Sequence, residues 1–104
     1  MTLPELAHEL NSLYPTRYSH FSSAQEPPFI CYLDDGSNNF YADNKVFMEG
    51  ALVNIELYTK TKDFTAEKKI KEMLNDNEIP YEQSPTVFIE SEGVFQCIFS
   101  VTLI

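Results

Sequence analysis

The last eleven residues, Val94 to Ile104, constrain the fold most, because they alternate between apolar and polar side chains. Successive side chains of a strand point to opposite faces of a sheet, so this period predicts a strand with one buried face. The apolar set is Phe95, Cys97, Phe99, Val101 and Leu103, against Gln96, Ser100 and Thr102. Residues 52–59 repeat the pattern, with Val53, Ile55, Leu57 and Thr59 against Asn54, Glu56 and Tyr58. Two long strands that each bury one face are therefore expected.

Two segments have helical spacing instead. Leu3, Leu6, Leu10 and Leu13 recur at helical intervals after a Thr2/Glu5 capping box, which predicts a helix over 3–13 that ends before Pro15. Asp63 or Thr65 can cap a second helix that ends near 75–77, since Pro80 forbids its continuation. Its apolar stripe is Ala66, Ile70, Met73 and Leu74, and we expect Glu67, Lys68, Lys69, Lys71 and Glu72 to face the solvent.

The remaining segments are shorter. The apolar run 29–33 predicts a strand covered on both faces, and the polar run 34–39 predicts a turn. Residues 16–28 read as a connection, and 40–48 as a segment with one short strand near its end. Residues 86–90 and 94–104 form a hairpin in outline, with its turn at 91–93.

This order of elements indicates a single α+β domain over residues 1–104. Each helix has only one apolar stripe to bury, which favours a mostly antiparallel sheet of four to five strands with two helices packed on one face. With 43% hydrophobic residues, a chain of 104 residues can bury one core without a disulfide framework or a metal.

The net charge of −9 bears on the partners. Nucleic-acid backbones and anionic membranes bind clustered Lys and Arg, so we expect no direct nucleic-acid binding and no membrane association. The N-terminal residues lack the basic and apolar regions of a signal peptide, so none is expected. Cys31 and Cys97 lie in apolar runs without CxxC spacing, which predicts buried free thiols and a reducing cytosol; a disulfide between them is the alternative.

Motifs for catalysis are missing from the sequence. His8 and His20 have no catalytic or ligand spacing to a cysteine, and no nucleophile elbow, phosphate loop or zinc-protease motif occurs. Asp34, Asp35, Asn38 and Asp43 only distantly resemble a calcium loop, because no glycine stands at the required offset and no bidentate glutamate ends the segment. We therefore expect a protein that is not an enzyme and has no catalytic residues, no cofactor and no metal site.

Aromatic residues gather in the irregular segments instead. Phe40, Tyr41 and Phe47 stand among small polar residues in the stretch from Asp34 to Met48. Tyr and Phe are effective anchors of protein interfaces. We therefore predict a protein-interaction surface there, formed by Phe40, Tyr41, Asp43 and Phe47.

Four stretches resemble a family of small proteins from the head–tail morphogenesis modules of long-tailed phages and prophages of Gram-positive bacteria. They are 25–32, 42–47, 54–59 with Lys62-Asp63, and 88–92, in the same order as in the family. Such proteins are similar to tail terminators or tail-completion proteins. The resemblance implies a small α+β subunit that assembles with itself as a ring, commonly a hexamer.

The resemblance also implies partners and a location. The ring would cap the tail tube, contact the tail tube protein and join the tube to the head connector proteins. It would assemble in the cytoplasm of the host bacterium and remain in the virion at the head–tail junction. A neck or head-completion protein is the nearest alternative, and an acidic DNA-mimic inhibitor is the distant one, because the acidic residues are dispersed among lysines on the second helix.

Overall fold

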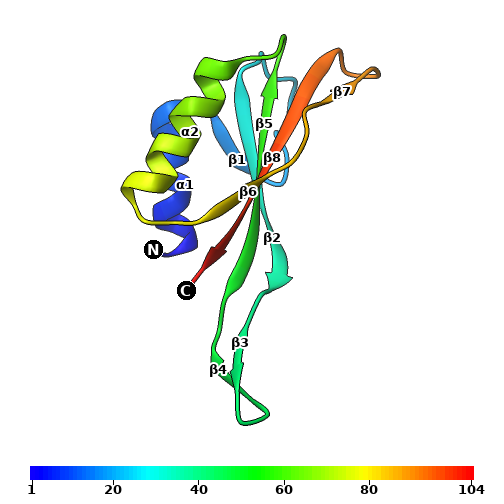
Figure 1. Cartoon of the computed structure of the whole chain (residues 1–104). Helices are drawn as coiled ribbons and strands as arrows, with labels where there is room; N and C mark the ends of the chain where they lie inside the picture. Colours follow the sequence, from blue (N-terminus) through cyan, green and yellow to red (C-terminus); the bar gives the residue numbers. More distant parts are fainter.

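A computed structural model describes all residues, 1–104, as two helices and eight strands (Figure 1). The helices are α1 (Leu3–Leu13) and α2 (Phe64–Asp76). The strands are β1 (Thr16–Tyr18), β2 (Phe29–Ser37), β3 (Phe40–Ala42), β4 (Lys45–Met48), β5 (Ala51–Thr59), β6 (Tyr81–Gln83), β7 (Val87–Ile89) and β8 (Val94–Leu103).

The main sheet has six strands, in the order β1-β2-β5-β8-β6, with β7 also paired to β8. β5 lies between the two other long strands, and its Ile55 is level with Tyr32 of β2 and Phe99 of β8. All pairs are antiparallel except β1 with β2. β3 and β4 form a separate two-stranded sheet. The α+β class is confirmed, and the sheet has more strands than the four to five predicted.

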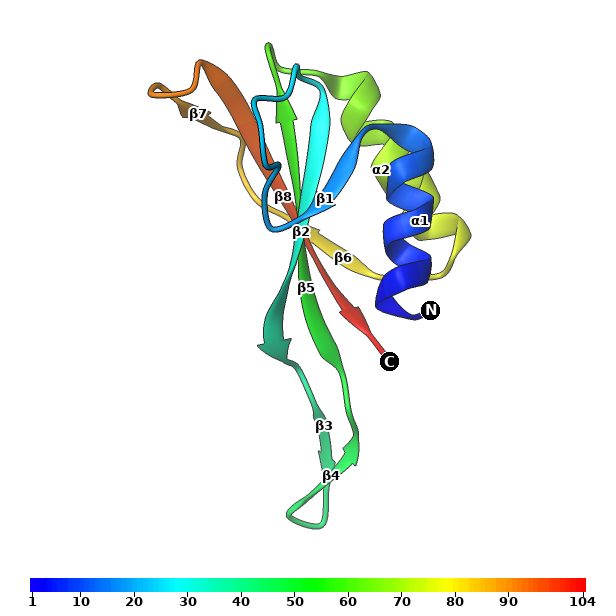
Figure 2. The same ribbon diagram turned by 180° about the vertical axis from the view of Figure 1, so that it is seen from behind.

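One core joins the helices to the sheet. Figures 1 and 2 draw α1 and α2 on the same side of the main sheet. Most of the apolar set of β5 and β8 is buried there together with the central residues of both helix stripes. Phe95, expected in this set, is instead half-buried and packs against Phe88 of β7, with ring centroids 5.0 Å apart, because it lies where β8 extends beyond the helices. The core includes Leu6, Leu10, Ile55, Leu57, Ile70, Leu74 and Phe99. The alternation that predicted β5 and β8 therefore identified the core face of each strand.

The helix starts follow from their capping residues. Thr2 and Glu5 form the capping box, with Thr2 N donating to Glu5 Oε1 at 2.9 Å and Glu5 N donating to Thr2 Oγ1 at 3.3 Å. Asp63, rather than Thr65, caps α2 by accepting a hydrogen bond from Ala66 N at 3.0 Å. Both caps satisfy backbone N–H groups that a first helical turn leaves without a partner.

The turn predicted over 34–39 is wrong, because β2 continues to Ser37, which pairs with Ala51. A β-bulge between Asp34 and Ser37 accommodates the polar residues, and Gly36 adopts a φ of +92° there. The chain reverses only at Asp43-Asn44, so 40–48 holds two strands rather than one. Polar residues in an exposed ribbon resemble a turn in composition, which explains the error.

Two further expectations are corrected. The connection 16–28 contains the three-residue strand β1, and β6 lies at 81–83, where no element was predicted; both strands are too short to show a period. Glu67 does not face the solvent, since only 5% of it is exposed. Its carboxylate lies 2.7 Å from Lys62 Nζ and accepts a hydrogen bond of 2.7 Å from Gln83 Nε2. The ion pair with Lys62 and the hydrogen bond from Gln83 offset part of the free-energy cost of burying the Glu67 carboxylate.

Candidate protein-interaction site

The most prominent feature is a hairpin that projects from the body, residues 38–50, which we call the arm. It carries β3 and β4 and continues the ribbon of β2 and β5 beyond the main sheet (Figure 1). The molecule is accordingly elongated, with extents of 48 × 27 × 25 Å. Neither helix extends along the arm (Figures 1 and 2).

Specific contacts fix the base of the arm. Asn38 N donates to Gly50 O at 2.8 Å, and Gly50 N donates to Asn39 Oδ1 at 3.0 Å. Asn38 Nδ2 also donates to Thr102 Oγ1 at 3.0 Å, which ties the arm to β8. A Cβ on Gly50 would lie 2.3 Å from Asn38 O and 2.6 Å from Thr102 Cγ2. Only glycine, which has no Cβ, fits at position 50 between Asn38 and Thr102.

The tip of the arm is a two-residue turn. Ala42 pairs with Lys45, which leaves Asp43 and Asn44 between the strands, with φ of +52° and +61°. Short Asp and Asn side chains tolerate this left-handed backbone, and such turns match the twist of a hairpin. Asp43 of the predicted interaction set is thus a turn residue, exposed at the tip.

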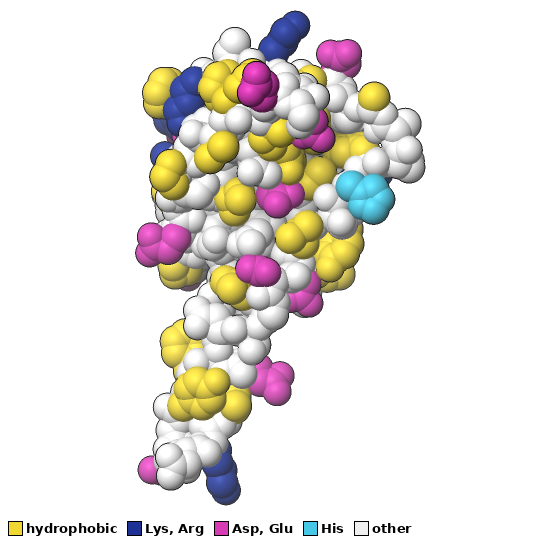
Figure 3. All heavy atoms as spheres, turned by 90° about the vertical axis from the view of Figure 1, so that its right-hand side faces the viewer, with side chains coloured by type: hydrophobic (Ala, Val, Ile, Leu, Met, Phe, Trp, Pro, Cys, Tyr) yellow, Lys and Arg dark blue, Asp and Glu magenta, His cyan; other side chains and the backbone are white.

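The arm exposes several apolar side chains. Phe40 is 50% exposed, and Tyr41 and Phe47 are each 72% exposed. Tyr41 is the cross-strand partner of Val46, and Phe40 is that of Met48, with a register shift between the two pairs. Figure 3 shows hydrophobic side chains along the arm and one basic side chain near its end. Lys45 is the only Lys or Arg of the arm.

The structure therefore brings all four predicted interaction residues onto one projection. Val46 and Met48 complete the exposed apolar set, and sequence reasoning missed them. The strand of Val46 and Met48 has only four residues, which is too short for its sequence pattern to predict which side chains are exposed. No side chain of this set belongs to the core.

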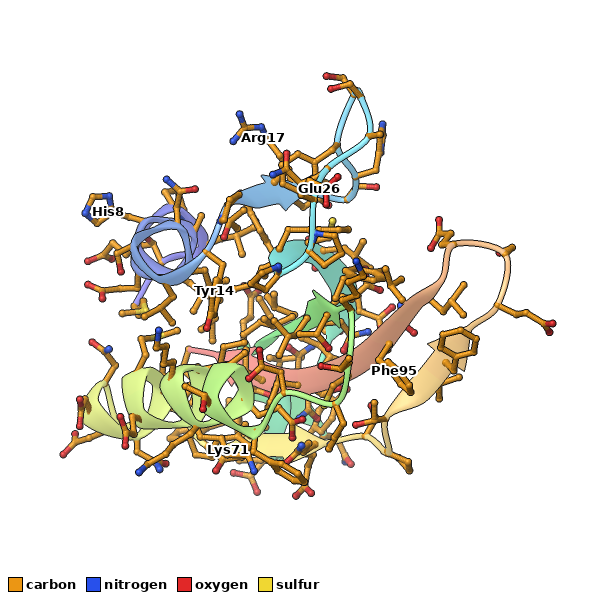
Figure 4. All side chains as sticks on the ribbon, turned by 90° about the horizontal axis from the view of Figure 1, so that it is seen from above. His8, Tyr14, Arg17, Glu26, Lys71 and Phe95 are labelled. Atoms are coloured by element: carbon orange, nitrogen blue, oxygen red, sulfur yellow. The ribbon has the colours of Figure 1, made fainter.

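A cavity of about 560 Å³ lies at the opposite end of the molecule, between the β1–β2 loop and the sheet. Figure 4 looks onto this end and shows Glu26 on that loop. Apolar side chains line much of the cavity, including Phe21, Pro27, Phe29 and Val94. The exposed carboxylates of Glu26 and Glu92 also line it. Sequence reasoning missed this cavity, since its walls come from segments some 65 residues apart.

The sheet face away from the core carries a half-buried polar network. Gln96 Nε2 donates to Tyr58 Oη at 2.9 Å, and Tyr58 Oη donates to Glu56 Oε1 at 3.1 Å. Burial raises the pKa of Glu56 above its ordinary value, and the hydrogen bond from Tyr58 opposes this shift. Burial also raises the pKa of Tyr58 to about 12 and that of the neighbouring Cys31 thiol to about 11. Each of these shifts favours the neutral form of its group.

The two cysteines lie on opposite faces of the sheet. Cys31 is level with Glu56 on the polar face, whereas Cys97 is level with Leu57 and belongs to the core. Both are buried free thiols. A disulfide would have to pass through the sheet, so the alternative of a Cys31–Cys97 bond does not fit this geometry.

The whole structure offers no group of three or more His, Cys, Asp or Glu side chains that could hold a metal ion. Neither of its two helices has the length and apolar character needed to cross a membrane. Comparison with models of protein families and with curated proteins finds no match for this chain.

Proposed function

We propose that the protein is a structural morphogenesis protein of a long-tailed phage or prophage and acts as a tail terminator. Copies of the chain would join into a ring that caps the tail tube and connects it to the head connector. The observation that carries this proposal is the arm, which exposes the side chains of Phe40, Tyr41 and Phe47 to water. A surface of this kind supports a role in assembly.

The physical reason lies in the stability of the arm. A two-stranded hairpin without a covering layer is marginally stable in water. Contiguous exposed apolar surface of this kind typically marks an interaction site. Aromatic side chains that a partner buries provide much of the binding energy of an interface. A partner that covers the arm would therefore both order it and gain affinity from it.

The position of the arm supports a ring. The arm lies at one end of an elongated subunit, away from the helices (Figures 1 and 2). A contact between such an end and a different surface of the next copy is heterologous, and heterologous contacts close into rings when the rotation allows it. A terminator needs this kind of contact.

The net charge of −9 supports an assembly that depends on salt and protein concentration. Copies with a net charge of −9 repel one another at low salt, and a Debye length of about 8 Å at physiological ionic strength screens much of this repulsion. We therefore expect a monomer in dilute solution and rings at high concentration, at higher salt or on a tube end. Acidic side chains around the lumen would let DNA pass without adhering.

The test is to mix the protein with its cognate tail tube protein and image the tube ends by negative-stain electron microscopy. We expect wild type to cap the ends and the double variant Phe40→Ser/Tyr41→Ser to lose capping while keeping its fold. Phe64→Ser/Val87→Ser is a matched control, because it removes two other exposed apolar side chains, on α2 and β7. Bare tube ends with wild type at every salt concentration would contradict the terminator function and favour the neck protein.

A further inference from the structure

The arm and the end cavity lie at opposite ends of the same ribbon. Phe29 lines the cavity at the start of β2, and Ala42 lies at the tip of the arm. The thirteen steps between them, at about 3.3 Å each, extend the chain by about 40 Å. This agrees with a longest extent of 48 Å. The arm therefore cannot reach the cavity of its own chain, so an arm that occupies this cavity has to come from a second copy.

One basic side chain of the arm can pair with acidic side chains of the cavity. Lys45 stands near the tip of the arm and is the only Lys or Arg between Arg17 and Lys60. The cavity presents the carboxylates of Glu26 and Glu92, both exposed to solvent. No Lys or Arg lines the cavity directly, although the Arg17 guanidinium lies 5.6 Å from the centre of the Phe21 ring in its wall. The tip also carries Asp43, so the charge complementarity is confined to Lys45 and these two carboxylates, and their pairing favours this contact over random collisions.

The surfaces also match in size and polarity. Cavities that bind ligands commonly have volumes of about 300–1,000 Å³ and mostly apolar walls with a few polar groups. The end cavity has about 560 Å³, and the rings of Phe21 and Phe29 form part of its wall, 5.3 Å apart edge to face. Tyr41 and Phe47 are the most exposed aromatic side chains of the arm. Aromatic side chains prefer edge-to-face contacts such as this wall would offer.

We propose that the arm of one copy inserts Tyr41 and Phe47 into the end cavity of the next copy, where Lys45 pairs with Glu26 and Glu92; this rests on the proposed function, for which it supplies the ring contact. Donor and acceptor surfaces differ and lie at opposite ends of the chain. The contact is therefore head-to-tail, and each copy both gives an arm and receives one.

Photo-crosslinking identifies the surface that the arm contacts. Phe47 is replaced by p-benzoylphenylalanine, and the protein is mixed with ¹⁵N-labelled wild type at high concentration. After irradiation, crosslinked peptides that contain one labelled and one unlabelled partner report contacts between copies. We expect these crosslinks to map to residues 19–29 and 92–94. Crosslinks to any other region of the second copy, or none, would overturn the arm-in-cavity contact.

Charge reversal tests the same contact by compensation. Lys45→Glu alone, or Glu26→Lys/Glu92→Lys alone, should weaken self-association about tenfold at high protein concentration and physiological salt, because each places like charges together. The triple variant with all three changes should restore it. Asp76→Lys at the end of α2 is the control for a change in net charge, since it lies in neither surface. Failure of the triple variant to recover would also overturn the contact.

These outcomes separate the contact from the function. Capped tube ends together with crosslinks outside the cavity would leave the terminator function standing and reject this contact. When the irradiation is repeated with the tail tube protein present, crosslinks to that protein alone would assign the arm to that partner and reject the contact as well. Crosslinks in the cavity with bare tube ends would establish the contact and reject the terminator function.

Discussion

Asn38 and Thr102 lie 64 positions apart in the sequence and are joined by a hydrogen bond of 3.0 Å from Asn38 Nδ2 to Thr102 Oγ1. This bond connects the base of the arm to β8, a long strand of the main sheet. Gly50 passes between the two residues so closely that no side chain fits. The sheet therefore sets the direction in which the arm projects, and the arm can present its aromatic side chains in one orientation.

Gly50→Ala should displace the base of the arm. Its Cβ would lie 2.3 Å from a backbone oxygen, Asn38 O, which cannot move aside as a flexible side chain can. Crowding of this kind costs about 1–3 kcal/mol. Hydrogen–deuterium exchange should show faster exchange in residues 38–50 and little change in β8. Glu49→Ala, at the exposed neighbouring position, is the control. Equal exchange rates in the two variants would contradict this role of Gly50.

Leu74→Ala and Phe99→Ala should each destabilise the fold strongly. Both side chains are fully buried where α2 packs on the sheet. Removing so much apolar volume from a core costs about 2–5 kcal/mol. Urea unfolding followed by circular dichroism measures the loss, with the exposed Lys68→Ala as the control. Values within about 0.5 kcal/mol of wild type for both core variants, the range of surface substitutions, would contradict this packing.

Glu56→Gln should stabilise the protein at neutral and alkaline pH. Because the pKa of Glu56 is raised in the folded state, folding favours the protonated carboxyl. The stability that Glu56 contributes is fully present below its unfolded pKa and is lost as pH rises through the folded pKa. Glutamine stays neutral and can still accept the hydrogen bond from Tyr58 Oη.

The free energy of unfolding, measured in urea at about pH 8 and about pH 4, tests this expectation. The advantage of the glutamine variant should be largest at the higher pH and shrink at the lower one. Glu82→Gln, at an exposed position of β6, controls for the loss of one negative charge. An advantage that does not change with pH would be inconsistent with a raised pKa.

Cys31 should react slowly with alkylating reagents in the native protein. Only the thiolate attacks such reagents, and burial raises the pKa of Cys31 to about 11. Its rate of labelling should rise steadily with pH until about 11. Both Cys31 and Cys97 should react once the protein is unfolded without a reducing agent. An intact mass that shows a disulfide would contradict the separation of these thiols by the sheet.

The parts of the fold that the sequence predicts well have a period or a cap. The alternation around Ile55 and Phe99 identified both long strands and their buried face, and the Thr2/Glu5 box marked the start of α1. β1 and β6 were missed because three residues cannot show a period. Glu67 was misplaced, since its burial depends on Lys62 and Gln83, which only the tertiary fold brings to it.

The interaction site was predictable only in its residue types. Composition singled out Phe40, Tyr41 and Phe47, and the structure adds that they lie on a projecting hairpin. The hairpin itself was hidden because Asp34 to Asn39 has the composition of a turn. The end cavity was not predictable, since it forms where the β1–β2 loop meets Val94 of a distant strand.

Native mass spectrometry across a range of protein and salt concentrations tests most directly whether the arm drives assembly of this chain. We expect a monomer in dilute, low-salt samples and a single closed ring at high concentration and higher ionic strength. Phe40→Ser/Tyr41→Ser should remain monomeric under the same conditions, whereas Phe64→Ser/Val87→Ser should assemble as wild type does. A wild type that stays monomeric throughout, or an arm variant that forms the same ring, would contradict the account.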